Sequence, residues 1–368
     1  MSREAIFEAS LAFFLSPVQA FLEDPTVTEV MVNGCDAIYV ERQGRLSRTE
    51  ARFDSEDSLL TAVHNVAQYV GREIDENRPV LDARLPDGSR VHAVIPPSAR
   101  QGTYLTIRKF SREVFELDHL VRLGSLSAVA REFLDVCVRL HKNLVVAGGT
   151  GTGKTSLLNA LSTAIPAEER IVVIEDSSEL RLQQPHTLYR EAQQADTRGR
   201  GGLSIRDLFR ASLRMRPDRI VVGEVRGGEA LDMIQSMISG HSGSMTTVHA
   251  SNPRDALVRL ETLSLMSDVE IPVYVARAQV ASAIHLIVQL TRLSEDGSRR
   301  ISRITEAHGL EQDRYQFRDL FVLQMRGRDQ RGRLQGELEP TGLAPTFAAE
   351  AAEQGLLDQI RLTRELWT

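Results

Sequence analysis

The hydrophobic pattern of the first 110 residues switches between a period of two and a helical period. Val27–Val32 and Ala37–Glu41 alternate and predict two strands, with Asn33-Gly34 favouring a tight turn between them. Asp57–Val70 carries apolar residues at helical spacing and predicts a helix. Two more strands are predicted at Arg90–Ile95 and Tyr104–Arg108. The pattern is typical of a small α+β domain spanning residues 1–110.

From residue 126 onward, predicted strands alternate with predicted helices, which indicates an α/β domain with a mostly parallel sheet. The predicted strands are Leu144–Ala147, Ile171–Ile174, Thr187–Glu191, Ile220–Val225 and Ser244–Val248. Alternation over residues 299–324 predicts an addition at the sheet edge, and the last 25 or so residues have amphipathic helical spacing. The polar stretch 111–125 is predicted to be a linker, which leaves 126–368 as the second domain.

Composition narrows the class of protein. With 368 residues, 42% apolar and 26% charged, the chain resembles an ordinary two-domain globular protein. A net charge of −6 argues against a surface that coats nucleic acid. No run of 18 apolar residues predicts a membrane span, and Ala5–Leu15 contains Glu8 and lacks the basic start of a signal peptide. We therefore expect a cytoplasmic protein.

Metal chemistry at cysteines is not expected. Cys35 and Cys137 are far apart, and neither has a second Cys or a His at ligand spacing. Two cysteines cannot build a four-cysteine zinc site, so we expect no zinc. Each is better explained as a small buried apolar residue.

The most specific motif is the run Gly148-Gly149-Thr150-Gly151-Thr152-Gly153-Lys154-Thr155, which fits G-x-x-x-x-G-K-[ST]. It follows a predicted strand and precedes the helical segment beginning at Ser156, which is the context that a phosphate-binding loop requires. Glycines let backbone N–H groups turn toward phosphate oxygens at the start of a helix. Lys154 is predicted to reach the β- and γ-phosphates of ATP, and the Thr155 hydroxyl to ligate Mg²⁺.

Acidic residues end two of the predicted strands. Ile171–Ile174 runs into Glu175-Asp176, and the strand beginning at Ile220 runs through Gly223 into Glu224. Ligands of open α/β sheets collect at the carboxyl ends of strands, so these acids are expected near the loop. Gly223 stands where a metal-organising Asp is usual, which leaves Glu224 to supply the carboxylate of this strand. The alternative is that the acids only cap turns.

Two histidines eight residues apart, His241 and His249, flank the strand predicted at Ser244–Val248. We interpret both as candidates for hydrogen bonding to the γ-phosphate. A buried structural histidine is the competing explanation for each.

Together these segments resemble the secretion ATPases that drive type II and type IV secretion and type IV pili. Residues 173–180, 214–230 and 240–250 look like their Asp box, Walker B and His box. The resemblance is strongest to the CpaF-type ATPases of Tad pilus assembly, and it runs from Asp24 through most of the chain. It implies a RecA-like P-loop domain behind a small N-terminal domain.

The resemblance also implies roles for individual residues. Glu175 would be the general base that polarises water, and Glu224 would order the water shell of Mg²⁺. A positive charge for the γ-phosphoryl group would come from an N-terminal-domain arginine, often across a subunit boundary. The matching residues are Arg90 and Arg108.

Two departures separate branches of the family. Type II secretion and pilus-extension ATPases commonly carry a four-cysteine zinc element, and retraction enzymes space the two histidines one residue closer. Both differences favour the Tad or type IV secretion branch. The resemblance further implies a hexameric ring attached to an inner-membrane platform protein.

Two functions of other classes compete with this interpretation. A P-loop nucleic-acid translocase is disfavoured because aromatic and basic residues are not interleaved as single-strand binding requires. A nucleotide-dependent scaffold that does not hydrolyse ATP stays open because Gly223 replaces the usual Asp.

Overall fold

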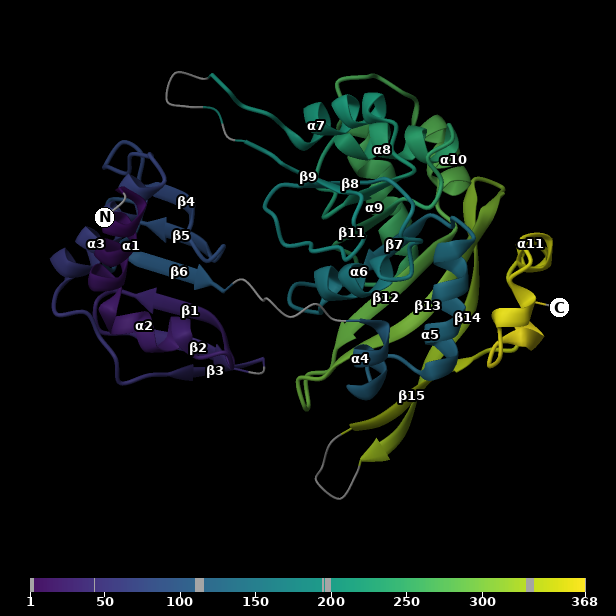
Figure 1. The fold of residues 1–368 in the computed structure, drawn as a ribbon, viewed down its shortest axis with the longest axis horizontal. Helices are drawn as coiled ribbons and strands as arrows, with labels where there is room; N and C mark the ends of the chain where they lie inside the picture. Colours follow the sequence, from purple (N-terminus) through teal and green to yellow (C-terminus); the bar gives the residue numbers. More distant parts are fainter. Residues whose placement is uncertain are drawn as a thin grey trace. The chain divides into compact units, whose positions relative to one another are not determined.

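The computed structural model describes residues 3–42, 44–109, 116–193, 195, 200–328 and 334–367. The chain divides into two compact units, Met1–Glu113 and Val114–Thr368, which are described separately (Figure 1). Across these described ranges, each helix is either too short or too polar to cross a membrane.

The first unit combines an antiparallel sheet with helices that precede and follow its first three strands in the sequence. Its described helices are α1 (Arg3–Phe14), α2 (Ser16–Glu23) and α3 (Glu56–Tyr69). Its strands are β1 (Val27–Asn33), β2 (Ile38–Arg42), β3 (Arg45–Arg48), β4 (Val80–Arg84), β5 (Arg90–Val94) and β6 (Tyr104–Arg108). The strand order is β3-β2-β1-β6-β5-β4. The predicted strands and the predicted helix of this region are all present.

Helix α3 shows why the chain folds this way locally. The Ser55 hydroxyl accepts a hydrogen bond from the Ser58 N–H, and the Ser58 hydroxyl accepts one from the Ser55 N–H, so the helix start is capped reciprocally. Its apolar face, which includes the buried Leu59 and Val63, packs into the core beside the inward residues of the sheet. Because strand side chains alternate, Arg90 and Arg108 lie on the opposite face from Val91.

The second unit carries a larger, mixed sheet. Its described helices are α4 (Leu117–Arg122), α5 (Ala128–Arg139), α6 (Lys154–Ser162), α7 (Ile205–Ser212), α8 (Glu229–Ile238), α9 (Pro253–Leu265), α10 (Val273–Ala283) and α11 (Ala349–Glu353). Its strands are β7 (Leu144–Ala147), β8 (Ile171–Glu175), β9 (Thr187–Glu191), β10 (Arg219–Val222), β11 (Met245–Val248), β12 (Leu286–Arg292), β13 (Arg299–Glu311), β14 (Arg314–Arg328) and β15 (Leu334–Pro340).

The sheet order is β15-β14-β13-β12-β7-β11-β10-β8-β9. Pairing is parallel from β12 through β9, and β13, β14 and β15 add to the β12 edge in antiparallel fashion. The predicted fold class and the predicted edge addition are both confirmed. The addition is a set of long strands: β14 alone runs from Arg314 to Arg328.

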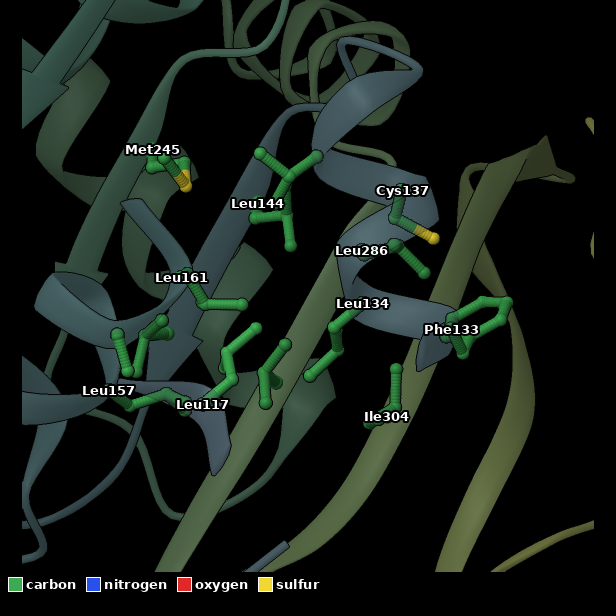
Figure 2. Packing of buried hydrophobic residues seen from close by; sticks show 14 of the residues in the cluster. Leu117, Phe133, Leu134, Cys137, Leu144, Leu157, Leu161, Met245, Leu286 and Ile304 are labelled. Carbon is green, nitrogen blue, oxygen red and sulfur yellow. The ribbon is translucent and has the colours of Figure 1, made fainter. Parts of the chain in front are cut away.

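The parallel strands β7, β8, β10 and β11 are buried on both faces, whereas the edge strand β9 is partly exposed. Along β7, Leu144 and Val146 join the core beneath α5 and α6, whereas Val145 and Ala147 join the core on the other face with α8 and α9. Figure 2 shows the first of these cores, where Leu144 lies among side chains of helices and strands. A continuous apolar run such as 144–147 is typical of this double burial.

Two predictions need correction here. The expected C-terminal amphipathic helix is wrong: α11 covers only Ala349–Glu353, and Gly355, with φ +69°, ends it. Beyond it the described chain forms two short 3₁₀ helices, Leu357–Gln359 and Arg364–Leu366. The Glu132 carboxylate accepts the N–H groups of the residues between them, Arg361, Leu362 and Thr363.

The stretch 111–125, predicted to be a linker, also differs from the expectation. Residues 110–115 lie outside the described residues. The rest contains α4, whose Leu117 and Leu120 are buried in the core of the second unit. The polar residues that led to the linker prediction belong to a short amphipathic helix.

Candidate active site

The candidate site lies at the carboxyl edge of the parallel strands. The phosphate loop, residues 148–155, leaves β7 at Ala147 and enters α6 at Lys154. Gly151 and Gly153 have φ values of +70° and +94°, which only glycine adopts at little cost. The neighbouring strands β11, β10 and β8 run parallel to β7, so their last residues reach the same edge.

Lys154 is folded back into its own loop. Its Nζ donates hydrogen bonds to the carbonyl oxygens of Gly148, at 3.2 Å, and Gly149, at 3.0 Å, and it lies 3.3 Å from Nδ1 of His249. The residue is buried, with 8% of its surface exposed. A buried ammonium surrounded by carbonyl oxygens is preorganised to exchange these partners for phosphate oxygens.

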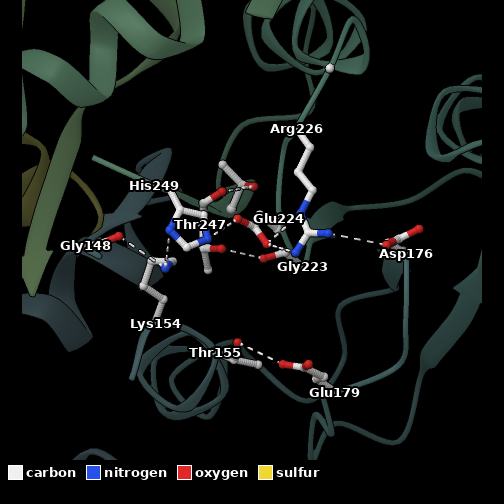
Figure 3. Close-up of polar contacts among 12 residues, drawn as sticks. Gly148, Lys154, Thr155, Asp176, Glu179, Gly223, Glu224, Arg226, Thr247 and His249 are labelled. Carbon is white, nitrogen blue, oxygen red and sulfur yellow. Dashed lines mark hydrogen bonds and ion pairs between the residues drawn. The ribbon is translucent and has the colours of Figure 1, made fainter. Parts of the chain in front are cut away.

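His249 links the loop to Glu224 (Figure 3). Its Nε2 lies 2.7 Å from Oε1 of Glu224 while Nδ1 faces Lys154. Burial and the nearby Lys154 cation lower the pKa of His249. A neutral ring fits both neighbours, because Nδ1 can accept from the ammonium while Nε2 carries the proton toward the carboxylate.

Glu224 is held on its other side by Arg226. Oε2 of Glu224 accepts hydrogen bonds from Nε and Nη2 of Arg226 at 2.9 and 2.6 Å, and Nη1 of Arg226 lies 3.5 Å from Asp176. The other oxygen, Oε1, is buried and lies 2.7 Å from Nε2 of His249. A carboxylate oxygen has two lone pairs, so Oε1 keeps one for a cation or for a water bound to one.

Glu175 does not lie where a base for water is expected. It is 4% exposed, and its Oε1 accepts hydrogen bonds from the backbone N–H groups of Glu179, at 2.8 Å, and Leu180, at 2.9 Å. Burial raises its pKa to about 7. This carboxylate therefore braces the turn that follows β8.

The turn braced by Glu175 presents a residue that the sequence analysis did not select. The Thr155 hydroxyl donates a hydrogen bond to Oε2 of Glu179 at 3.2 Å (Figure 3). Glu179 thus faces the first turn of α6, directly after the phosphate loop. The signal was present in the sequence, because Glu179 closes the Glu-Asp-x-x-Glu-Leu stretch.

The presence of glycine at position 223 has a steric explanation. A Cβ atom at this position would lie 2.9 Å from Cγ of Glu175, closer than real contacts allow. The backbone is also fixed, since the Thr247 hydroxyl donates to the Gly223 carbonyl at 2.8 Å and the Gly223 N–H donates to Ile174 at 2.9 Å. The space that an Asp would need is filled by the Glu175 side chain.

The remaining candidates lie elsewhere. His241 is in the loop before β11, at the amino edge of the sheet, where its carbonyl accepts from the Ser244 hydroxyl at 2.8 Å. The structure therefore does not bring His241 together with Lys154. Arg90 and Arg108 belong to the first unit, where they are directly paired across β5 and β6.

Comparison with known proteins shows the family of this chain. Residues 14–335 match the family model described as "Type II/IV secretion system protein". The chain belongs to this family. Type IV secretion system protein PtlH of Bordetella pertussis is 37% identical over 321 residues, covering 80% of this chain and 94% of PtlH. Type IV secretion system protein VirB11 of Brucella suis is 33% identical over 326 residues, covering 80% and 90%.

A solved structure extends the comparison to the fold. The X-ray structure of the Legionella pneumophila ATPase DotB covers 78% of this chain and 79% of its own, with a TM-score of 0.56 at 19% identity. It supports the RecA-like architecture with an N-terminal domain. The expected superfamily of secretion ATPases is confirmed, at a coarser level than the CpaF-type branch that the motifs favoured.

Proposed function

We propose that this chain is an ATP-hydrolysing motor subunit that powers a secretion or pilus-assembly machine. The observation that carries the proposal is the convergence of the phosphate loop with Glu179, Glu224 and His249 at one sheet edge. Phosphoryl transfer to water needs mainly positioning and charge stabilisation, which these residues can supply.

The phosphates would be held by the loop and the start of α6. Backbone N–H groups of residues 149–156 would donate to the phosphates, and Lys154 would exchange its carbonyl partners for β- and γ-phosphate oxygens. The Thr155 hydroxyl and the buried Oε1 of Glu224 would hold Mg²⁺, directly or through water. When bound, Mg²⁺ neutralises charge that develops on the phosphates.

We assign the base to Glu179 and a positioning role to Glu175. Water attacks the γ-phosphorus, its proton passes to the Glu179 carboxylate, and the bond between the γ-phosphorus and the β–γ bridging oxygen breaks to give ADP and phosphate. Glu175 holds the N–H groups of Glu179 and Leu180 and so fixes where Glu179 points. His249, at the junction of Lys154 and Glu224, would couple the γ-phosphate to Glu224.

The cation for the transferring phosphoryl group is proposed to be Arg90 or Arg108. They are register partners on the outer face of their sheet, and Glu29 of β1 is the next partner of Arg108. The Arg108 charge opposes the burial that raises the pKa of Glu29. These arginines would act on a nucleotide bound by a neighbouring subunit in a hexameric ring.

The machine is the less specific part of the proposal. The motifs favour a Tad-type IV pilus, with assembly and retraction both open, whereas the names of PtlH and VirB11 favour a type IV secretion system. In either case the motor would sit on the cytoplasmic side of the inner membrane against a platform protein. Genes for pilins or for secretion-channel proteins beside this one would separate the two.

An ATPase assay with and without single-stranded DNA tests the activity. Phosphate release that needs Mg²⁺ and ignores DNA is expected. Stimulation by DNA would favour a translocase, and nucleotide binding with no release would favour a scaffold. Co-sedimentation with membranes only when the platform protein is present tests the location. A protein that stays in the supernatant with that partner present would contradict a motor role.

A further inference from the structure

The hairpin that joins β12 to β13, residues 290–299, lies against the outer side of the phosphate loop. A Cβ atom on Gly148 would lie 3.1 Å from the Leu290 carbonyl oxygen, and one on Gly153 would lie 3.5 Å from Cδ of Arg299. A Cβ atom on Gly151 would lie 3.6 Å from Nη1 of Arg292. Three glycines of the loop therefore face the same hairpin.

Register explains why the hairpin reaches the loop. β12 pairs with β7 in parallel, with Gln289 opposite Ala147, the last residue before the loop. β12 continues to Arg292, and Arg292 pairs with Arg299 at the start of β13. The hairpin thus extends past the end of β7 on the side where the loop emerges.

The turn itself is held in one shape. Leu293 and Ser298 are joined by a backbone hydrogen bond of 2.8 Å, and Gly297 donates to Leu293 at 2.9 Å. Asp296 accepts the Ser298 N–H at 2.9 Å with one oxygen and the Leu334 N–H at 3.2 Å with the other. A braced turn can position what it touches.

One contact from the hairpin reaches the backbone of the loop. Nε of Arg299 donates a hydrogen bond to the Gly151 carbonyl oxygen at 2.9 Å. In a trans peptide the C=O and the following N–H point in opposite directions. Holding the Gly151 oxygen toward the hairpin therefore turns the Thr152 N–H away from it, to the inner side of the loop.

We propose that Arg299 is a positioning residue of the nucleotide site, acting within its own chain. It fixes the Gly151–Thr152 peptide so that the Thr152 N–H is ready to donate to phosphate before the nucleotide arrives. Arg292, against the same glycine, closes the outer face of the loop. The inference rests on the proposed function, because it concerns how the phosphate loop binds ATP.

A positioning role for Arg299 predicts which nucleotides bind more weakly when the residue is replaced. A residue that shapes the loop affects every nucleotide with a β-phosphate, whereas a residue that touches the γ-phosphate affects ATP alone. Loss of a hydrogen bond from a charged group at a loop costs about tenfold in affinity. We expect Arg299→Ala to weaken ATP and ADP equally, by about that factor, with KM raised and kcat at saturation retained.

A second variant separates the hydrogen bond from the charge. Glutamine places its amide nitrogen at the same number of bonds from the backbone as Nε of arginine, and it has no charge. If Arg299 acts by holding Gly151, Arg299→Gln recovers most of the affinity that Arg299→Ala loses. If the charge acts on the nucleotide instead, the two variants bind equally poorly, and the proposal is overturned.

The neighbouring Arg300 is the matched control. Its guanidinium bonds to the carbonyl oxygens of Gly124 and, at 3.1 Å, Leu334, away from the loop. Arg300→Ala should therefore leave the dissociation constants of ATP and ADP unchanged, even where it lowers the melting temperature.

The experiment measures both constants for the full chain by competition with a fluorescent nucleotide. Equal affinity in Arg299→Ala and the wild type overturns the inference alone, as does an equal loss in Arg300→Ala, which would indicate general loosening. A wild-type chain that binds neither nucleotide rejects the proposed function, and the inference with it.

Discussion

Gly223 lies against Glu175 so closely that a Cβ atom on the glycine would be 2.9 Å from Cγ of the glutamate. Glu175 is the last residue of β8, and Gly223 directly follows β10, whose Val222 is in register with Ile174. A glycine at the usual place of a metal-organising Asp thus serves the placement of Glu175. Its presence is no argument for a protein that cannot hydrolyse ATP.

The first prediction concerns this contact. Gly223→Ala should destabilise the chain by roughly 1–3 kcal/mol, the usual cost of overpacking a core. In a Glu175→Ala background the same change should cost much less, because Cγ is gone. Urea unfolding of the wild type, the two single variants and the double variant measures the coupling between the two positions. Strictly additive effects would show that the contact is not responsible.

The second prediction separates the two glutamates. Glu179→Gln should keep nucleotide binding and lower kcat by at least about 100-fold, because the amide cannot accept the proton of water. Glu175→Gln should lower kcat less, since its amide oxygen can still accept the N–H groups of Glu179 and Leu180. Single-turnover phosphate release measures both.

The exposed Glu168, before β8, is the control for this charge change. Glu168→Gln should hydrolyse ATP at the wild-type rate. Native turnover in Glu179→Gln with loss in Glu175→Gln would return the role of base to Glu175.

The third prediction follows from the raised pKa of Glu175. Burial lifts it from the model-peptide value of 4.5 to about 7, so the folded chain holds a proton here that the unfolded chain releases. Between these two values the folded state binds more protons, and this group's contribution to stability falls as pH rises. Above pH 7 the ionised form costs about 3 kcal/mol.

The difference in unfolding free energy between the wild type and Glu175→Gln isolates this effect, since other titrating groups cancel. The wild type should lose stability relative to the variant from pH 4.5 to 7. Burial lowers the pKa of His285 to about 4, so the contribution of His285 to stability rises with pH. This contribution is the same in both proteins. A difference in unfolding free energy that stays constant over that pH range would show that the pKa of Glu175 is not raised.

The fourth prediction concerns Lys154. Lys154→Ala should abolish hydrolysis and weaken ATP binding, because it removes the ammonium held by Gly148, Gly149 and His249. Calorimetric titration and a phosphate-release assay measure the two losses. Turnover near the native rate would reject the phosphate-loop assignment.

The fifth prediction tests the two paired arginines across a subunit boundary. Mixing Arg108→Ala chains with Lys154→Ala chains should recover part of the activity, because some interfaces then combine an intact loop with an intact arginine. The same mixture is made with Arg90→Ala. Arg84, the next register partner of Arg90 on β4, supplies the control, and Arg84→Ala alone should stay active. Absence of recovery in both mixtures, with subunit exchange verified, would confine the site to one chain.

The sequence alone determined the phosphate loop and the framework around it. Strand, glycine turn and helix are consecutive, so their order fixes the local geometry without help from the rest of the chain. The same holds for the apolar runs at Leu144–Ala147 and Ile171–Ile174, whose double burial is written in their composition. Glu224 and His249 could also be predicted, because each comes just after one of two adjacent strands, β10 and β11.

Only the tertiary structure decided where the remaining residues lie. Glu175 and Glu179 are four residues apart, and which one faces Thr155 depends on hydrogen bonds inside a turn, where no periodicity applies. His241 is placed at the opposite edge from His249 because β11 separates them. Arg299 reaches Gly151 across 148 positions of sequence, through a sheet register that no local pattern encodes.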